Sequence, residues 1–220
     1  MSVSATARLE HGTEYQRIPR SRGSRTLKRI MDVAVSATLL LLSAPVIAVL
    51  ALRIKLHDGG PILFRRRVIG PKGEFDAFKL RTMRVDADEV LERNPALRKK
   101  FEIHFKLKHD PRVTRVGTGL RRSGLDELPQ LWNVLKGEMS LIGPRMITAA
   151  ELEKFGVYGW IFNCMKPGLT GPWQLEGTHE GGYARRAAMD LWYLKNWSFL
   201  LDLKILIKTP MRVVRGPRVQ

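Results

Sequence analysis

A run of 20 residues without a charged side chain, residues 33–52, constrains this chain more than any other feature. A helix of about 20 apolar residues is long enough to cross the hydrocarbon core of a bilayer. Pro45 lies near the middle of the run, where it removes a backbone hydrogen bond and clashes with the preceding helical turn. The sequence therefore predicts a membrane helix over residues 30–58 that is broken between Ser43 and Pro45.

The flanks of this run indicate its topology. Both are basic, with Arg25, Lys28 and Arg29 before the run and Arg53, Lys55 and Arg65 to Arg67 after it. The positive-inside rule keeps basic flanks on the cytoplasmic side, and here it applies to both. We therefore expect a re-entrant helix that enters and leaves the bilayer by one face, with the Ser43 hydroxyl bonding a freed backbone group. A kinked helix that spans the bilayer, with a translocated C-terminal domain, is the alternative.

The charge of the whole chain restricts its partners. The formal net charge of +17 calls for anionic partners, which include nucleic acid, anionic lipid and phosphorylated substrates. No nucleic-acid-binding module is recognisable, so we expect no nucleic-acid partner. A single cysteine, Cys164, excludes an internal disulfide, and its apolar neighbours indicate a packing position. The five histidines lack zinc-ligand spacing, so no structural metal is predicted.

The remaining pattern predicts an α+β fold that is mainly helical. We expect a flexible basic arm over residues 1–29, a cytoplasmic catalytic domain over 59–210 and a basic tail over 211–220. Residues 62–68 and 74–80 read as strands of a small β-hairpin around the turn at 70–73. Residues 84–108 predict one or two surface helices. A last helix, from about Tyr183 to Lys208, is amphipathic and suits a membrane surface; an ordinary core helix is the alternative.

Two adjacent carboxylates, Asp126 and Glu127, are the strongest candidates for chemistry. Apolar residues at helical spacing follow them, and Gly137 is suited to end that helix. Pro129 is tolerated only in a first turn, so we expect the helix to begin near Asp126. A helix N-terminus attracts phosphate, and an ionised carboxylate there can serve as nucleophile or metal ligand. Helix capping, supported by the capping-box spacing from Ser123, is the alternative.

Four arginines add candidate phosphate-binding groups. Each lies beside a turn or a predicted strand end: Arg67, Arg81, Arg121 and Arg145. A guanidinium group binds phosphate through two parallel hydrogen bonds. In a chain with 38 Lys and Arg, a solvated surface charge is the alternative for any one of them. Neither a P-loop nor a Rossmann fingerprint occurs, so the common nucleotide-binding loops are absent.

Seven short motifs occur in order along the chain: KRIMD (28–32), GPILF (60–64), FKLRTM (78–83), LDELPQL (125–131), KGEMSLIGPR (136–145), KPGLTG (166–171) and YLKNWS (193–198). Through these motifs the chain, from about residue 27 to residue 210, closely resembles the bacterial sugar transferase family, the monotopic polyprenyl-phosphate phosphoglycosyl transferases. Each motif alone is weak, but so many in order make a chance match implausible. The family also has a re-entrant membrane helix, which supports the bent form over the span.

The resemblance implies a two-step transfer. Asp126 would attack the sugar-linked phosphorus of a UDP-sugar and release UMP, and a polyprenyl phosphate, expected to be undecaprenyl phosphate, would then take the phosphosugar from the aspartate. Glu127 would deprotonate the acceptor or hold a Mg²⁺ ion with Asp126. Arg121 and Arg145 match phosphate-binding positions, and we add Lys79, Arg81 and Arg67 as substrate-binding candidates. A C-terminal motif supports the site through Asp190, Tyr193, Asn196 and Trp197.

The last third of the chain points to the sugar. Residues 177–183 and 190–193 resemble the enzymes that prime exopolysaccharide synthesis with galactose or glucose, so a UDP-hexose is expected. The alternatives are a UDP-N-acetyl sugar and a non-catalytic membrane scaffold. The expected location is the bacterial inner membrane, with the catalytic domain in the cytoplasm among membrane lipids and with downstream glycosyltransferases as possible partners.

Overall fold

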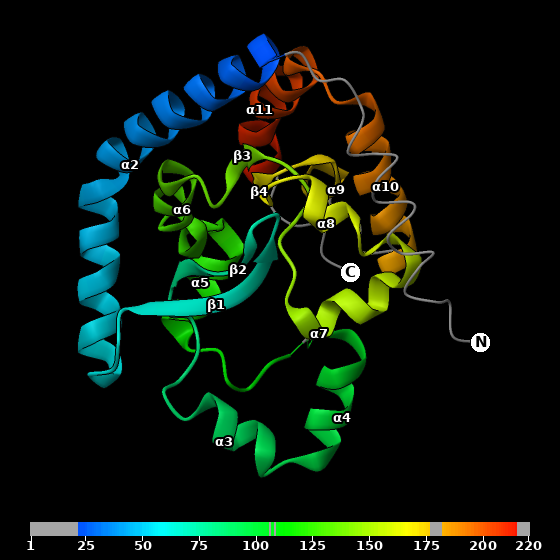
Figure 1. Ribbon diagram of the computed structural model, residues 1–220. Coiled ribbons are helices and arrows are strands. Elements are labelled where there is room, and N and C mark those ends of the chain that lie inside the picture. Colours follow the sequence, from blue (N-terminus) through cyan, green and yellow to red (C-terminus); the bar gives the residue numbers. More distant parts are fainter. Residues whose placement is uncertain (1–21, 106, 108, 177–181, 215–220) are drawn as a thin grey trace.

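The computed structural model describes residues 22–105, 107, 109–176 and 182–214, and within them the fold is mostly helical (Figure 1). Its helices are α2 (Arg22–Asp58), α3 (Ala87–Glu92), α4 (Pro95–His104), α5 (Arg115–Ser123), α6 (Gln130–Lys136), α7 (Ala149–Leu152), α8 (Ile161–Cys164), α9 (Pro172–Glu176), α10 (Gly182–Asn196) and α11 (Phe199–Val214). Two 3₁₀ turns are η1 (Leu125–Glu127) and η2 (Glu153–Tyr158). The strands are β1 (Leu63–Gly70), β2 (Gly73–Leu80), β3 (Ser140–Ile142) and β4 (Gly168–Thr170).

Helix α2 carries the long apolar run. It is long and apolar enough to cross a membrane, judged by length and composition, and it continues through Pro45 with a bend near its middle (Figure 1). The Ser43 hydroxyl donates to the Leu40 carbonyl at 3.4 Å, beside the proline. The re-entrant path stays a prediction. Residues 22–29, expected within the flexible arm, are instead the first turns of α2; residues 1–21 lie outside the described residues.

The predicted hairpin is confirmed. β1 and β2 pair antiparallel, from Leu63 opposite Leu80 to Gly70 opposite Gly73, and Gly73 adopts the positive φ of +106° that the turn requires. Asn133 of α6 fixes the hairpin in place, because its side chain accepts from the Phe78 amide at 3.0 Å and donates to the Asp76 carbonyl at 2.8 Å. These two hydrogen bonds set the position of strand β2 over α6.

A second sheet, which the sequence did not predict, joins β3 and β4 in parallel. Ser140 pairs with Gly168 and Ile142 with Thr170. A Cβ atom on Gly168 would lie 2.1 Å from the Gly143 nitrogen, so the close approach of the two chains requires a glycine. Strands of three residues are too short to show an alternating pattern, which is why β4 escaped prediction.

The predicted single C-terminal helix is wrong, because the chain forms two. α10 ends at Asn196 and α11 begins at Phe199. The Ser198 hydroxyl accepts from the Leu201 amide at 3.1 Å and so caps α11. The indole Nε1 of Trp197 donates to Asp202 at 3.1 Å across the corner. The apolar pattern runs through this corner unbroken, so the serine cap was the only local sign of the break.

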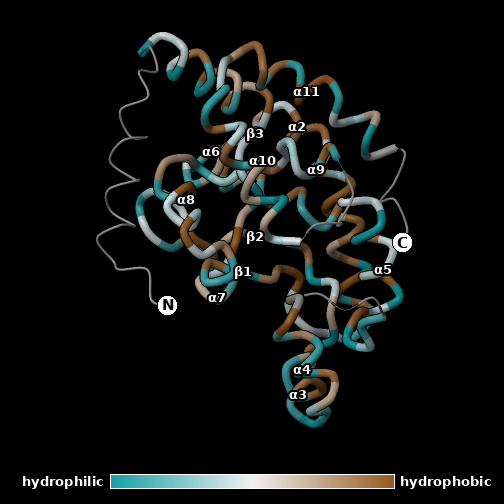
Figure 2. The backbone as a smooth tube through the Cα atoms, turned by 90° about the vertical axis from the view of Figure 1, so that its right-hand side faces the viewer, coloured by the Kyte–Doolittle hydropathy of each residue, from teal (hydrophilic) through white to brown (hydrophobic). Residues whose placement is uncertain are grey.

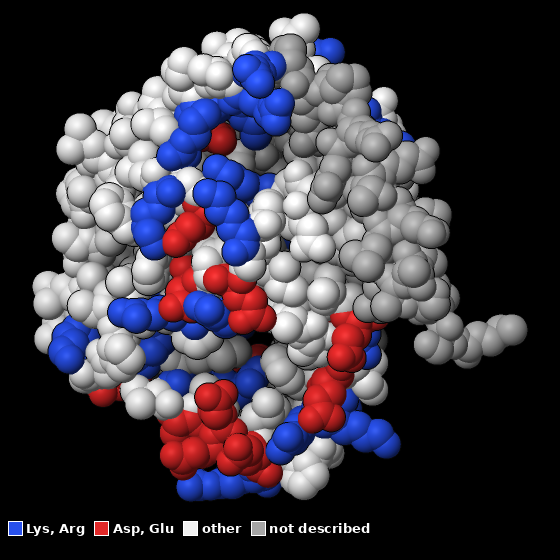
Figure 3. All heavy atoms as spheres, viewed as in Figure 1, with Lys and Arg blue, Asp and Glu red and all other residues white. Residues whose placement is uncertain are grey.

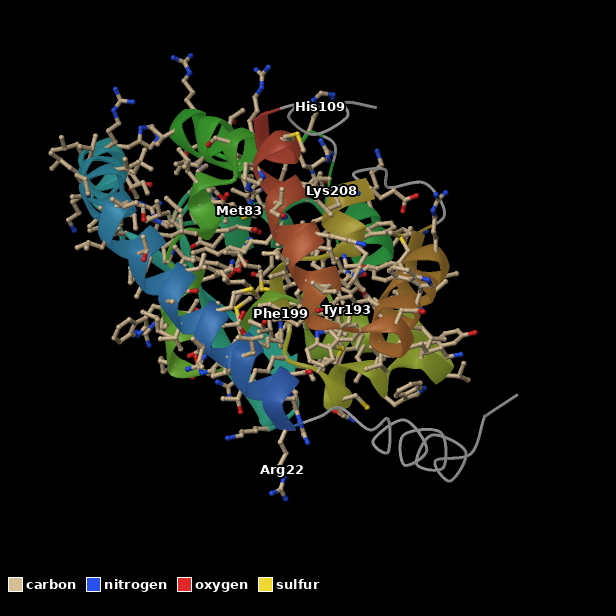
Figure 4. The ribbon with its side chains drawn as sticks, turned by 90° about the horizontal axis from the view of Figure 1, so that it is seen from above. Arg22, Met83, His109, Tyr193, Phe199 and Lys208 are labelled. Atoms are coloured by element: carbon tan, nitrogen blue, oxygen red, sulfur yellow. The ribbon has the colours of Figure 1, made fainter. Side chains whose placement is uncertain are left out.

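Helices α2 and α11 share one face of the molecule, which Figure 4 shows from above with Arg22, Phe199 and Lys208 labelled. Hydrophobic residues recur along both helices in Figure 2. On α11 the exposed ones are Leu200, Leu203, Ile207 and Met211, and on α2 they include Leu41, Leu42, Val49 and Leu52. An apolar face of this size on two neighbouring helices is typical of a membrane-contacting surface.

Buried polar contacts attach the start of α2 to the core. Asp32 accepts from the Ser140 hydroxyl at 2.8 Å and from the Leu141 amide at 3.1 Å. Arg29 donates to two carbonyls in the last turn of α6, of Val134 at 2.6 Å and of Leu135 at 2.7 Å. The first turns of α2 are therefore part of the folded domain, and Ile54 near the other end of the helix is buried with Leu80 and Leu120.

The Asp202 cluster, formed by Lys28, Tyr193, Trp197 and Asp202, makes the third attachment. Asp202 is fully buried and accepts from the Lys28 ammonium at 2.6 Å and from the Tyr193 hydroxyl at 2.6 Å. Lys28 and Tyr193 also donate to the carbonyl of Ile142, at 3.1 Å and 3.3 Å. The cluster thus joins α2, α10 and α11 to strand β3, which leads directly to Arg145.

Candidate active site

Asp126 and Glu127 lie in the 3₁₀ turn η1, between α5 and α6. Gly124, with φ of +71°, ends α5 and reverses the chain, and α6 begins only at Gln130. The predicted helix start near Asp126 is therefore four residues too early, because the proline at 129 precedes the helix instead of lying in its first turn. Gly137 ends α6 with φ of +82°, as predicted.

Glu127 binds two cations from distant parts of the chain. Lys79, near the end of β2, donates to its carboxylate at 2.6 Å, and Arg145 donates to the same oxygen at 3.4 Å. Burial opposes ionisation of Glu127, but the two cations outweigh it and lower the pKa to about 2. Glu127 is therefore a permanently ionised group that holds Lys79 and Arg145 in place.

Asp126 has the opposite electrostatic environment. It is 7% exposed, and one carboxylate oxygen lies 3.8 Å from the Lys79 nitrogen, beyond hydrogen-bonding distance. Burial raises the pKa of Asp126 above its usual value, with help from the negative charge of Glu127, while Lys79 and Arg121 oppose the rise. A carboxylate of raised pKa is more basic than its neighbour, which suits Asp126 better than Glu127 to the predicted role of nucleophile.

Arg121 completes the cationic surroundings of Asp126. It comes from the last turn of α5, and its Nε donates to the Thr82 hydroxyl at 2.8 Å. This bond fixes one side of the guanidinium group, while the side chain stays exposed to solvent. Lys79, Arg121 and Arg145 therefore lie around the carboxylate pair, and their binding of phosphate stays a prediction.

Arg81 is not brought into this site. Its guanidinium group forms a two-point ion pair with Asp58, the last residue of α2, with one contact at 2.6 Å. It also donates to the carbonyls of Pro61 at 2.6 Å and Met83 at 2.9 Å. These partners occupy the guanidinium group, so Arg81 connects the end of α2 to the hairpin.

Arg67 also lies apart from the carboxylate pair. It is exposed on strand β1, where it contacts Glu74 at 3.3 Å and Asp76 at 3.2 Å across the hairpin. Exposed pairs of this kind contribute at most about 1 kcal/mol to stability. The position of Arg67 is that of a surface residue of the hairpin.

The residues of the C-terminal motif lie in α10 and in the corner that follows it, and their support of the site stays a prediction. Tyr193 and Trp197 belong to the Asp202 cluster, and Asn196 donates to the Trp192 carbonyl at 2.8 Å near the end of α10. Asp190 is fully buried one turn from Arg186, an arginine that the sequence analysis did not select. Its i, i+4 spacing to Asp190 was the signal that could have found it.

Asp126 and Glu127 could bind a magnesium ion only together with ligands from a bound substrate. The described residues contain no group of three or more His, Cys, Asp or Glu side chains placed to hold a metal ion. Mg²⁺, however, is commonly bound by one or two carboxylates together with substrate phosphates. Asp126 and Glu127 supply such carboxylates, so the predicted ligands are chemically suited to a metal shared with a phosphate group.

The charge on the surface agrees with an anionic substrate. Figure 3 shows Lys and Arg side chains gathered over the middle and upper part of one face, with Asp and Glu side chains between them. A surface that mixes many cations with a few carboxylates attracts phosphate while keeping the cations in defined positions. The arrangement suits phosphoryl transfer, in which positioned charges do most of the catalytic work.

Known proteins resemble this chain over most of its length. It is 42% identical over 199 residues to the undecaprenyl-phosphate galactose phosphotransferase of Salmonella typhimurium, covering 88% of this chain and 42% of that protein. It is 42% identical over 187 residues to the exopolysaccharide production protein ExoY of Rhizobium meliloti, covering 83% of each. The UDP-glucose:undecaprenyl-phosphate glucose-1-phosphate transferase of Escherichia coli is 36% identical over 201 residues, covering 87% of this chain and 41% of that protein.

The relationship is therefore to a shared segment in several of these proteins. The chain spans about two fifths of the length of the first relatives that it matches, and most of the length of ExoY. The family model described as bacterial sugar transferase matches residues 23–216, which include both carboxylates and all three surrounding cations. The chain belongs to the bacterial sugar transferase family.

Proposed function

We propose that this protein transfers a hexose 1-phosphate, galactose or glucose, from a UDP-sugar to undecaprenyl phosphate and releases UMP. The observation that carries the proposal is the buried Asp126 carboxylate, whose pKa is raised beside an ionised Glu127 and three cations. The names of relatives that act on galactose and glucose substrates support the choice of a hexose. The name of ExoY, an exopolysaccharide production protein, supports a role in exopolysaccharide synthesis, and we propose that this role is its first membrane step.

The reaction proceeds in two displacements at one phosphorus atom. An Asp126 oxygen attacks the sugar-linked phosphorus, the bond from that phosphorus to the bridging oxygen breaks, and UMP leaves with the electron pair. An oxygen of undecaprenyl phosphate then attacks the same phosphorus, and the Asp126 carboxylate leaves. The products are UMP and undecaprenyl diphosphate hexose. Lys79, Arg121 and Arg145 neutralise the phosphate charge in both steps.

Glu127 supports the reaction mainly through its cations. With a pKa of about 2 it is a weak proton acceptor, so holding Lys79 and Arg145 fits it better than removing a proton from the acceptor. A bound Mg²⁺ ion, for which Asp126 and Glu127 are the expected ligands, would neutralise further phosphate charge.

The proposed location is the cytoplasmic face of the bacterial inner membrane. One substrate is charged and soluble, and the other carries a long lipid tail, so a site beside the apolar face of α2 and α11 reaches both. On the re-entrant path, cysteines placed before Arg22 and after Leu56 are both shielded from a periplasmic thiol reagent. Labelling of only one of them would establish a full span.

The reaction is tested by UMP release from purified protein. UDP-galactose, UDP-glucose and UDP-N-acetyl sugars are each supplied with Mg²⁺ and undecaprenyl phosphate, with a chelator in a parallel set. Asp126→Asn is expected to abolish both turnover and the radiolabelled phosphosugar on the protein. Asp86→Asn, on the exposed Arg84–Asp86 pair, is the control. Turnover retained by Asp126→Asn removes that residue as nucleophile, and no UMP from any UDP-sugar favours a non-catalytic scaffold.

A further inference from the structure

Arg186 of α10 is a buried arginine that contacts the loop carrying Arg145. It is 7% exposed, and its Nη2 donates to the Arg145 carbonyl at 2.5 Å and to the Met146 carbonyl at 3.5 Å. The guanidinium group also lies over the Phe155 ring, 5.0 Å from the ring centre. Arg186 thus holds the backbone carbonyl of Arg145, whose guanidinium group reaches Glu127.

The rest of this loop is fixed at its two ends. The Gly143 amide donates to the Thr170 carbonyl at 3.0 Å, and the Pro144 carbonyl accepts from Gly168 at 2.8 Å. At the other end, the Ile147 carbonyl accepts from Ile69 at 2.9 Å. Between these points, Arg186 is the side chain that donates to the two carbonyls, so it determines the path of the backbone from which the Arg145 side chain extends.

Burying the Arg186 guanidinium group costs free energy, which indicates that its contact with the Arg145 and Met146 carbonyls does more than fill space. Its Nε lies 3.8 Å from the carboxylate of Asp190, and neither carboxylate oxygen of Asp190 has a hydrogen-bond partner among the described residues. Burial raises the pKa of Asp190 to about 7 and lowers that of Arg186 to about 10, so burial opposes the charged form of both groups. An apolar pair of similar volume would pack here without that cost.

We propose that Arg186, held by Asp190, is a positioning residue that aims Arg145 at the phosphate of the substrate. The inference rests on the proposed function, since it assigns Arg186 and Asp190 an effect on transfer that passes through Arg145. It also gives Asp190 of the C-terminal motif a specific part: its carboxyl group lies 3.8 Å from the Arg186 Nε and is the nearest acidic partner of the buried guanidinium group.

A double-mutant cycle tests this path, with UMP release measured for the UDP-sugar that the wild-type protein uses. Arg186→Gln is expected to lower kcat/KM about tenfold or more. The loss is expected in whichever of kcat and KM is changed by Arg145→Ala. In the Arg145→Ala background, the same substitution is expected to change kcat/KM less than about twofold, because the group that it positions is gone. Arg185→Gln, at the neighbouring exposed arginine that pairs with Glu176, is the matched control.

Two further variants keep the test decisive if Arg186→Gln fails to fold. Arg186→Lys retains the charge and one donor and is expected to recover part of the activity, whereas Asp190→Asn is expected to lose activity only when Arg145 is present. Equal losses in both backgrounds, or unchanged kinetics in folded Arg186 variants, would overturn the inference. An inactive wild-type protein would instead refute the proposed function, so the two failures are distinguishable.

Discussion

The substitution Asp202→Asn tests how firmly the apolar helix α2 is attached to the rest of the fold. Asp202 is fully buried and accepts from Lys28 at 2.6 Å, Tyr193 at 2.6 Å and Trp197 at 3.1 Å. Asparagine has nearly the same volume, so no cavity forms. It removes the negative charge, however. Its NH₂ group, which is a hydrogen-bond donor, also replaces a carboxylate oxygen that accepts hydrogen bonds from the surrounding donors. The Lys28 side chain, only 14% exposed, then loses its hydrogen-bonded charged partner and keeps only the Asp32 carboxylate, at 3.9 Å.

The magnitude follows from the loss of one member of a buried ion pair. Breaking such a pair costs about 3–5 kcal/mol, because the remaining charge stays buried without compensation. In a chain of this size, a destabilisation of 1 kcal/mol lowers Tm by about 2–4 °C. The expected drop in Tm for Asp202→Asn is therefore roughly 6–20 °C.

The assay is thermal unfolding of the detergent-solubilised protein, followed by circular dichroism. Glu89→Gln, which breaks the exposed pair between Glu89 and Arg93, is the control, and it is expected to shift Tm by less than about 2 °C. The double variant Lys28→Met/Asp202→Asn is expected to be more stable than Asp202→Asn alone, because the uncompensated charge is removed. A shift in Asp202→Asn no larger than that of the control would refute the reasoning.

Two further predictions concern a glycine and the acid limb of the pH profile. In Gly117→Ala the new methyl group would lie 2.0 Å from the Thr82 carbonyl oxygen, so we expect the free energy of unfolding, measured with denaturant, to fall by about 1–3 kcal/mol. The control is Gly119→Ala on the same helix, where the methyl group meets open space and is expected to raise the free energy of unfolding by up to about 1 kcal/mol. Equal effects of the two substitutions would contradict the packing. In Lys79→Gln the cation that lowers the pKa of Asp126 is lost, so the acid limb of the plot of kcat/KM against pH is expected to move to higher pH. An acid limb that stays in place or moves to lower pH would exclude the ionisation of Asp126 as its origin.

Several features of the fold were predictable because a few neighbouring residues determine them. The charge-free run gave α2, and the glycines at the turn gave the hairpin. Gly137 marked the end of α6, since only a residue tolerant of positive φ fits there. The adjacent carboxylates of the candidate site were likewise visible without coordinates, because their chemistry is a property of the residues themselves.

The tertiary structure decided which of the many cations serve those carboxylates. Lys79 and Arg81 are two residues apart in one motif, yet Lys79 binds Glu127 whereas Arg81 binds Asp58. Strand β2 ends at Leu80, where the Arg81 amide bonds to the Ile62 carbonyl, so the two side chains belong to different parts of the fold. No local pattern in the sequence distinguishes them.

The same limit applies to Arg186 and to the β3–β4 sheet, whose partners lie far apart in the sequence. Arg186 contacts a carbonyl 41 residues earlier in the chain, and Lys28 reaches Asp202 across 174 residues. Sequence alone determined the long apolar helix, the hairpin and the carboxylate pair, because local backbone preference and side-chain chemistry set them. The pairing of charges depended on how the helices pack, since buried polar groups must find partners wherever the folded chain places them.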